Sequence, residues 1–447
     1  MERMAPVDAQ MYWMSDKIPN DQFLLYAFDG APEQLDDAID DVLDRARAVA
    51  DLGLRIADVD CALDYPYWVR GGVDREQVVV HGDAATDWPD CLRTVAALAE
   101  DQLDPRGSTW RLHLVQAVEG VPNCGPVATV AVLQVSHALA DGIRSSALAR
   151  AIFAPQPPGD PVTAQAQTPY SVVQAVALAA IRFPKQIGSL GWRAVEATRT
   201  HRQLVDDVAC GAVPPPSQGR PLLSTNSRPE GERAVRTLVF RRDDFPGPTV
   251  TISALTAISL ALSDHLRSTG EDPDTLGAEV SMEKFGKPMG RNHFRNVGIG
   301  LYSGTAALEV RTRQIAGALG ERQLRNSHPA LRASDEAFAA IPAPLLRWGV
   351  SQFDPAVVPA SVSGNTVVSS VNRGVADLRF GDRPVVFTAG YPALSPVMSV
   401  THGVHGIGDN VAISVHASQA AIEDIDGYMD MLRASVAWNQ IVRASGR

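Results

Sequence analysis

The sequence predicts an α/β fold made of two lobes. Before residue 211, apolar runs typical of strands alternate with segments of helical periodicity, and the same alternation resumes after residue 233. Between them, residues 211–233 contain three consecutive prolines and no sustained apolar period, which is typical of a linker. We therefore expect an N-terminal lobe at residues 1–210, a proline-rich linker at 211–233 and a C-terminal lobe at 234–447.

The N-terminal elements follow from apolar spacing. Residues 22–27 read as a strand, and Pro32 opens a helix whose inner face recurs at helical intervals. The nearly all-apolar run 127–135 predicts a strand buried on both faces. A helix follows the Asp-Gly pair at residues 141 and 142. The expected inner residues of the two helices are Leu35, Ile39, Val42, Leu43 and Ala46, then Ile143, Ala147, Leu148, Ala151 and Ile152.

Residues 155–161 are rich in proline and glycine and predict a loop. A helical stretch at 171–207 follows, and we expect Pro184 to break or kink it. In the C-terminal half, the pattern predicts a helix at 251–266. Strands are expected at 234–240, 366–371, 383–388 and 411–417.

Composition excludes several classes of protein. Forty basic residues against fifty-one acidic ones give a net charge of −11, which argues against a nucleic-acid binder. The four cysteines are far apart, so they favour a reducing compartment over a disulfide framework or zinc site. No secretory signal and no apolar run of about 18 residues is evident. We expect a cytoplasmic protein, and peripheral contact with a membrane or lipid droplet stays open.

The sharpest motif lies at the end of the buried strand, where His137 is followed by Asp141 and Gly142. A neutral imidazole with a pKa near 6.5 can accept a proton from an alcohol at neutral pH. Asp141 would pair with an arginine and fix the turn that aims His137, and Gly142 would permit backbone angles or close packing that a side chain blocks. The alternative is structural: His137 is a hydrogen-bonded strand-end residue, and Asp141 only caps the helix.

This segment resembles the HHxxxDG signature of the bacterial wax ester synthase/diacylglycerol acyltransferase family, within the CoA-dependent acyltransferase superfamily. The second histidine of the signature, the catalytic base, falls on His137, and the first falls on Ser136. Single-histidine forms serve in related acyltransferases and condensation domains. Because successive strand residues point to opposite faces, Ser136 is expected to face away from the side that His137 addresses and to shape or support the channel wall without sharing the proton transfer.

Further segments extend the resemblance over almost the whole chain. Residues 6–9 resemble the family's amino-terminal Ser-Pro-Leu-Asp-Ala stretch, and residues 226–233 resemble its Asn-Arg-x-x-Gly-x-Arg passage. Residues 249–262 resemble the helix that begins with Val-Asn-Asp, with Thr251 and Ile252 in place of Asn and Asp. Residues 368–374 are similar to the Ser-Asn-Val-Pro-Gly-Pro strand end, in a degraded form.

The resemblance implies a two-lobed, chloramphenicol acetyltransferase-like fold with mixed sheets and a channel at the lobe interface. It also implies an O-acyltransferase that moves a long acyl chain from acyl-CoA to a lipid or fatty alcohol, of the wax ester or diacylglycerol type, with no cofactor and no metal. One alternative is a carrier-protein thioester as donor, or another hydroxylated acceptor. The other is a catalytically impaired lipid-binding homologue, which the departures at Ser136, Thr251 and Ile252 favour.

Two other groups of residues are candidates for phosphate or metal binding. Lys284, Lys287, Arg291 and Arg295 form a basic stretch in an acidic chain, which is expected either to contact the CoA phosphates or to be a solvated loop. His402 and His405, with His416 nearby, lack the helical spacing and the glutamate of a metalloprotease. We therefore expect no metal site there.

Overall fold

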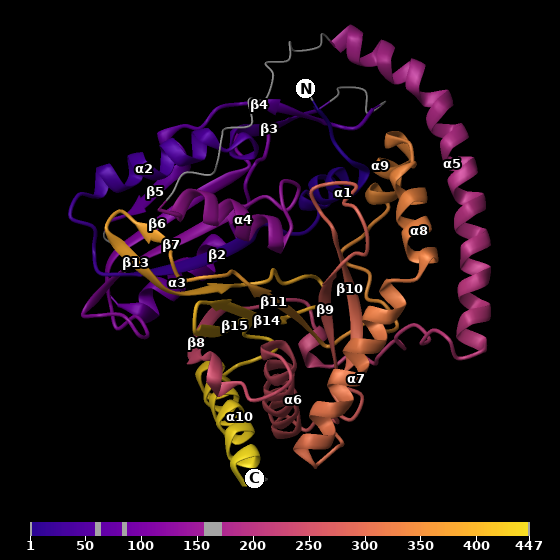
Figure 1. Cartoon of the computed structure of the whole chain (residues 1–447). Helices are drawn as coiled ribbons and strands as arrows, with labels where there is room; N and C mark the ends of the chain where they lie inside the picture. The colour runs from indigo at the N-terminus through magenta and orange to yellow at the C-terminus, as the bar shows by residue number, and fades with distance from the viewer. Residues whose placement is uncertain (1, 59–63, 83–86, 156–171, 446–447) are drawn as a thin grey trace.

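The computed structural model describes residues 2–58, 64–82, 87–155 and 172–445. The loop expected at 155–161 lies outside the described residues from residue 156 on. The chain folds into two six-stranded mixed sheets, a small three-stranded sheet and surrounding helices (Figure 1). The small sheet consists of β1 (Glu2–Arg3), β4 (Tyr67–Arg70) and β3 (Leu54–Ala57).

The first large sheet has the strand order β12-β13-β2-β7-β6-β5. Helices α2 and α4 pack on one face and α3 on the other, since alternate side chains of β2 and β7 belong to separate hydrophobic clusters. Strand β7 is thus buried on both faces, as predicted. The strands are β2 (Gln22–Asp29), β5 (Val78–His81), β6 (Trp110–Glu119), β7 (Val127–Val135), β12 (Arg379–Phe380) and β13 (Arg383–Gly390).

The second large sheet has the order β10-β9-β11-β14-β15-β8. Its strand β11 runs parallel to both β9 and β14, whereas the other pairs are antiparallel. Helices α6 and α10 lie along this sheet in Figure 1, and their apolar faces share its core. The strands are β8 (Arg233–Arg241), β9 (Gly277–Glu283), β10 (Phe294–Gly300), β11 (Thr366–Asn372), β14 (Val400–Ile407) and β15 (Asn410–Ser418).

The helices were partly expected. Those that sequence reasoning located are α2 (Leu35–Ala48), α4 (Gly142–Phe153), α5 (Val172–Ala209) and α6 (Val250–Ser268). The remaining helices are α1 (Pro6–Ser15), α3 (Trp88–Leu98), α7 (Leu308–Asn326), α8 (Pro329–Ala339), α9 (Ala343–Ser351) and α10 (Ile425–Ser445). No helix in the described ranges is both long enough and apolar enough to cross a bilayer.

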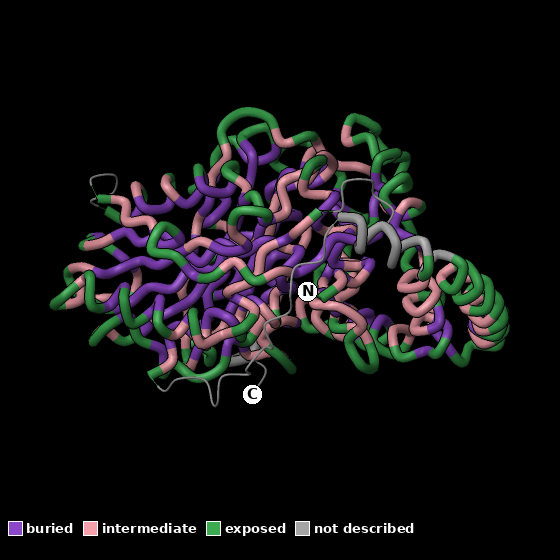
Figure 2. Tube along the Cα trace, turned by 90° about the horizontal axis from the view of Figure 1, so that it is seen from above, coloured by how far each residue is buried: buried purple, intermediate pink, exposed green. Residues whose placement is uncertain are grey.

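One expectation about the helices was wrong, and of the break or kink expected at Pro184 the break does not occur. Ile143 is 56% exposed and Ala147 is exposed as well, because the buried face of α4 carries Ser145, Leu148 and Ile152 instead. Pro184 does not end α5, which continues through it. The proline is exposed, so water can reach the backbone carbonyl that loses its donor. Helix α5 packs beside α8 and is largely exposed in its described part (Figures 1 and 2).

A crossover joins the two halves of the chain. Strand β13 comes from the C-terminal half but pairs with β2 in the first sheet, and it also packs against β14 and β15 of the second. Its inward side chains Val385, Phe387 and Ala389 are buried. A division of the chain at the proline-rich segment does not anticipate this exchange, because β13 completes a sheet whose other long strands precede that segment.

Candidate active site

His137 lies two residues beyond the end of β7 and lines a cavity of about 650 Å³. The cavity walls come from both large sheets: residues of β2 and the start of α4 on one side, and residues of β9, β10, β11 and β14 on the other. A cavity therefore lies at the lobe interface, where the channel was expected. His137 is one of the polar residues that the cavity receives from the N-terminal half.

The ring of His137 is held by Asn292. Nδ1 of His137 lies 2.9 Å from Oδ1 of Asn292. The amide orientation follows from the other end of Asn292, where Nδ2 donates to Oδ1 of Asp8 at 2.9 Å and to the backbone oxygen of His137 at 2.8 Å. Oδ1 must then accept, so Nδ1 of His137 carries the proton and Nε2 keeps a free lone pair. This is the tautomer that a base acting through Nε2 requires.

The charge state of the imidazole is set mainly by burial. Burial lowers the pKa of His137, while its own backbone carbonyl, Asn292 and the charge of Asp141 oppose that change. The ring also stacks on Phe294, with centroids 5.4 Å apart. The imidazole is thus favoured in its neutral form at neutral pH.

Asp8 anchors Asn292 from the opposite side. This carboxylate, on α1, accepts hydrogen bonds from the backbone nitrogens of Arg291 and Asn292 at 2.9–3.0 Å, besides the bond from the Asn292 amide. Asp8 is fully enclosed, and burial raises its pKa against those hydrogen bonds. The chain Asp8–Asn292–His137 therefore connects α1, the loop before β10 and the end of β7. Sequence reasoning noted residues 6–9 but assigned no role to Asp8, and it missed Asn292.

Asp141 has a structural position. It is the N-cap of α4, where Oδ1 accepts from the Arg144 nitrogen at 2.9 Å, and its Oδ2 accepts from the His293 nitrogen at 2.8 Å. The expected arginine side chain is not its partner among the described residues, since the Arg144 guanidinium pairs with Asp51 instead. Asp141 thus ties the turn after His137 to the loop that carries Asn292. No hydrogen bond joins it to His137 in the described part of the chain.

Gly142 and Ser136 differ from expectation. Gly142 lines the cavity with no positive φ, and a Cβ there would lie 3.6 Å from Cγ2 of Val371, an ordinary contact. Neither unusual backbone angles nor close packing requires glycine at this position. Ser136 lies beyond the last residue of β7, so strand alternation does not apply to it. It is buried, donates its backbone N–H to Thr109, and is not among the cavity-lining residues.

The basic stretch does not form one free patch. Lys284 and Arg295 both pair with Asp335, at 3.0 and 2.7 Å. Arg291 pairs with Asp51 at 2.6 Å and lies over the ring of Trp68. Only the Lys287 side chain is exposed and has no carboxylate partner among the described residues.

The degraded motifs and the C-terminal histidines also have places in the structure. Thr251, near the start of α6, hydrogen-bonds Ser370 of β11 at 2.8 Å. His402 contacts Thr366 and Tyr428 in the core of the second sheet, whereas His405 lines the cavity. Within the described ranges, no three His, Cys, Asp or Glu side chains are grouped to hold a metal ion.

The profile of the wax ester synthase/diacylglycerol acyltransferase catalytic domain matches residues 4–245. Among solved structures, the chain is similar to the wax ester synthase/diacylglycerol acyltransferase from Marinobacter aquaeolei VT8, with 17% identity, 99% of both chains covered and a TM-score of 0.64. No curated protein sequence matches.

Two further structures share the fold. Trichothecene 15-O-acetyltransferase TRI3 from Fusarium sporotrichioides has 12% identity, with 98% of this chain and 94% of that chain covered and a TM-score of 0.57. The starter condensation domain of rhizomide synthetase RzmA, in complex with C8-CoA and Leu-SNAC, has 16% identity, with 99% and 94% covered and a TM-score of 0.54.

Proposed function

Because the chain belongs to the wax ester synthase/diacylglycerol acyltransferase family, we propose that it is an O-acyltransferase that moves a long acyl chain from acyl-CoA to the hydroxyl of a lipid or fatty alcohol. The observation that carries the proposal is the state of His137. Its Nδ1 is held by Asn292, and its free Nε2 belongs to a cavity shared by both sheets. A base held in that way is suited to deprotonate an alcohol.

The reaction needs one proton shuttle. Nε2 of His137 takes the hydroxyl proton as the alcohol oxygen attacks the thioester carbonyl, whose π electrons move onto the oxygen. The tetrahedral oxyanion collapses, the carbon–sulfur bond breaks, and the imidazolium returns the proton to the CoA thiolate. The protein is proposed to form no acyl-enzyme and to use neither a metal nor a cofactor. Asp141 and Asn292 act by positioning His137.

The cavity supports an apolar substrate. Its volume falls within the range of about 300–1,000 Å³ that is usual for small-molecule sites. Apolar side chains line much of it, among them Phe23, Leu24, Ile143, Met282 and Val371. An alkyl chain would gain about 0.8 kcal/mol for each methylene that these side chains remove from water. This gain favours long-chain substrates over acetyl-CoA and small alcohols.

Exposed apolar side chains support peripheral contact with a lipid surface. Ile181, Trp192 and Val195 on α5 are 65–70% exposed, and Trp348 on α9 is also exposed. Exposed apolar residues gathered on one helix are typical of an interaction surface. Such contact would bring the cavity close to water-insoluble alcohols.

The test is to incubate the purified protein with radiolabelled long-chain acyl-CoA and a panel of alcohols. Labelled ester should form, and His137→Ala should lower its rate by about 10²–10⁴-fold. His81→Ala, at the partly buried end of β5 and outside the cavity lining, serves as the control. Ester formation at the wild-type rate in the His137 variant would refute the mechanism. Turnover with a carrier-protein thioester alone would refute the proposed donor. Binding of acyl-CoA without turnover would refute the proposed activity.

A further inference from the structure

The cavity has a second polar region away from the catalytic histidine. Arg373, directly after β11, and His405, on β14, both line it where the end of β13 crosses from the first sheet to the second. A methyl group built on Gly390 would lie 2.9 Å from Nη2 of Arg373 and 2.8 Å from Cε1 of His405. The guanidinium and the imidazole therefore converge on one point of the wall, which only a glycine leaves open.

Arg373 is a buried cation without a carboxylate partner among the described residues. Its side chain is 7% exposed, and it lies over the ring of Tyr26 at 5.3 Å. Nη1 donates to Thr388 Oγ1 and to the Ala389 carbonyl. Nε is buried and has no acceptor at regular hydrogen-bond geometry in the described part of the chain, and the hydroxyl of Tyr26 lies beside the guanidinium. A buried charge with an unsatisfied donor is costly unless another group completes it.

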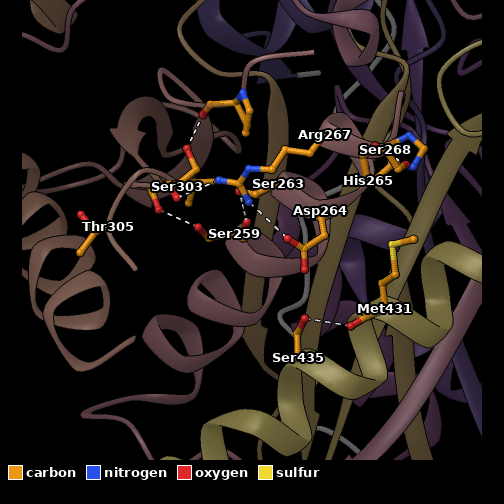
Figure 3. A network of polar contacts seen from close by, with 12 residues as sticks. Ser259, Ser263, Asp264, His265, Arg267, Ser268, Ser303, Thr305, Met431 and Ser435 are labelled. Atoms are coloured by element: carbon orange, nitrogen blue, oxygen red, sulfur yellow. Dashed lines mark hydrogen bonds and ion pairs between the residues drawn. The ribbon is translucent and has the colours of Figure 1, made fainter. Parts of the chain in front are cut away.

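The other buried arginines of the described ranges have their hydrogen-bonding groups satisfied by the protein. These arginines are Arg311 and Arg322, and Arg322 pairs with Glu321. Arg311 donates from Nε to the Thr305 carbonyl, from Nη1 to Ser259 Oγ and from Nη2 to the Ser303 carbonyl. Figure 3 shows Ser259 and Ser303 beside the side chain of Arg267, with Thr305 farther away. Arg311 is thus satisfied by the protein, and Arg373 is not.

In other arginines of this chain, the two nitrogens Nε and Nη2 together donate hydrogen bonds to one carboxylate. Arg236 holds Asp426 through Nε and Nη2, and Arg106 holds Asp104 through the same two nitrogens. In Arg373 the corresponding edge consists of the unpartnered Nε and of Nη2, which faces Gly390 and His405. Of these two donors, Nη2 faces the cavity wall and can donate a charge-assisted hydrogen bond to one carboxylate, whereas Nε is buried behind it.

The cavity holds too little positive charge for phosphates. Arg373 is the only lysine or arginine among the described residues that line it, and the lining also includes the carboxylates of Asp21, Asp141, Glu279 and Glu283. Burial and the charge of Arg373 hold the pKa of His405 well below 6.5, so this imidazole adds a hydrogen-bonding group and no charge. The diphosphate and phosphate of CoA are therefore not matched here, whereas one carboxylate can pair with Arg373 itself.

The region lies near the catalytic turn. Val371 on β11 is the residue that a side chain at position 142 would contact, and Val371 is the register partner of His405 on the neighbouring strand. Adjacent strands are about 4.8 Å apart. One extended ligand can therefore reach both His137 and Arg373.

We propose that Arg373, with His405 beside it, binds the carboxylate of an acyl acceptor, so that the preferred acceptor is a lipid alcohol that also carries a carboxylate. The identity of this ligand as the acceptor rests on the function proposed above, but the binding of the carboxylate does not. Arg373 is then a residue that determines specificity and does not take part in the proton transfer.

The experiment compares long-chain hydroxy fatty acids with their methyl esters by calorimetry, without acyl-CoA. The wild-type protein should bind the acid about tenfold or more tightly than the ester, as a charge-assisted hydrogen bond provides. Arg373→Met should bind both equally, and Arg373→Lys should keep part of the preference. Arg311→Met, the matched buried arginine outside the cavity lining, should retain the preference even where its melting temperature falls.

Equal binding of acid and ester by the wild-type protein would overturn the proposal without recourse to any variant. An Arg373→Met protein that still prefers the acid over the ester would also overturn it, whether or not that variant loses affinity for acyl-CoA. In turnover, Arg373→Met should raise KM for the hydroxy acid about tenfold and leave KM for its ester unchanged. If the wild type binds the acid selectively but transfers no acyl group, the proposed function fails while the carboxylate site stands.

Discussion

Replacing Asn292 with alanine tests how His137 is oriented. The substitution removes the acceptor of the His137 Nδ1–H and the donor to the His137 carbonyl, and also the amide that contacts Asp8. Asp8 keeps two backbone N–H donors. The main loss therefore falls on His137, whose ring becomes free to rotate or to change tautomer.

The size of the effect follows from the hydrogen bonds lost. Two bonds to His137 at a net 0.5–1.5 kcal/mol each amount to about 1–3 kcal/mol. If that energy is lost from the transition state, kcat/KM falls by about 5- to 150-fold. Because Asn292 opposes the lowering of the His137 pKa by burial, its removal should also move the acid limb of the pH–rate profile to lower pH.

The assay is ester formation from radiolabelled acyl-CoA across a pH series, with thermal melting as a check on folding. Asn296→Ala is the matched control, because Asn296 lies on β10, directly after the loop that carries Asn292, and lines the cavity of His137 but bonds to Ser281 and Glu279. If Asn292→Ala has the same kcat/KM as the control and the acid limb of its pH–rate profile does not move, Asn292 does not orient the base.

Three further predictions concern the same turn. Ser136→Ala should retain most activity, because Ser136 is outside the cavity lining; loss as complete as in His137→Ala would require the serine to act directly. Asp141→Asn should lower both kcat/KM and melting temperature. The new NH2 group cannot accept a hydrogen bond, so the backbone N–H of either Arg144 or His293 loses its acceptor, at a cost of about 1–3 kcal/mol. A variant with wild-type melting and turnover would contradict this. In the wild type, kcat/KM should fall on acidification with a midpoint below pH 6.5, because the base must be neutral and burial lowers the pKa of His137; a midpoint at or above pH 6.5 would contradict that assignment.

Two strands of the first lobe, β2 and β7, could be predicted because they carry continuous local signals. The run that became β7 is apolar at nearly every position and packs on both faces, so its limits are the limits of the apolar run itself. The helical face of α4 was misplaced because Ile143 borders the cavity. An apolar residue that faces a substrate cavity cannot be distinguished by periodicity from one that faces the core.

The candidate site was only half accessible from the sequence. His137, Asp141 and Gly142 lie close together in the sequence and form a recognisable motif, whereas Asn292 lies 155 positions away from His137 and reaches it through tertiary contact. Asn292 and His293 lie within the basic stretch, where the charges drew attention to phosphate binding. A signal did exist in residues 6–9, because an aspartate so near a helix start that is fully buried must find donors. Which donors it finds depends on the fold.

The last prediction separates two roles for the basic stretch. Arg291 reaches Asp51 from the loop that carries Asn292, with 10% and 21% of the two side chains exposed. Burial raises the pKa of Asp51, but the charges and hydrogen bonds of Arg291 and Arg144 outweigh it and lower that pKa below 3.8. Arg291→Met should therefore loosen the loop and lower the free energy of unfolding. Breaking an exposed ion pair costs about 1 kcal/mol and breaking a buried one about 3–5 kcal/mol, and we expect a cost between the two.

If Arg291 acts through this pair, its loss should lower melting temperature and kcat while KM for acyl-CoA stays constant. Lys287→Met provides the contrast, since Lys287 is exposed and lacks a carboxylate partner among the described residues. If the stretch contacts the CoA phosphates, Lys287→Met should raise KM for acyl-CoA and leave melting temperature and kcat unchanged. A raised KM with normal melting in the Arg291 variant would instead make Arg291 a phosphate ligand, and its pairing with Asp51 would then have to exchange for phosphate during binding.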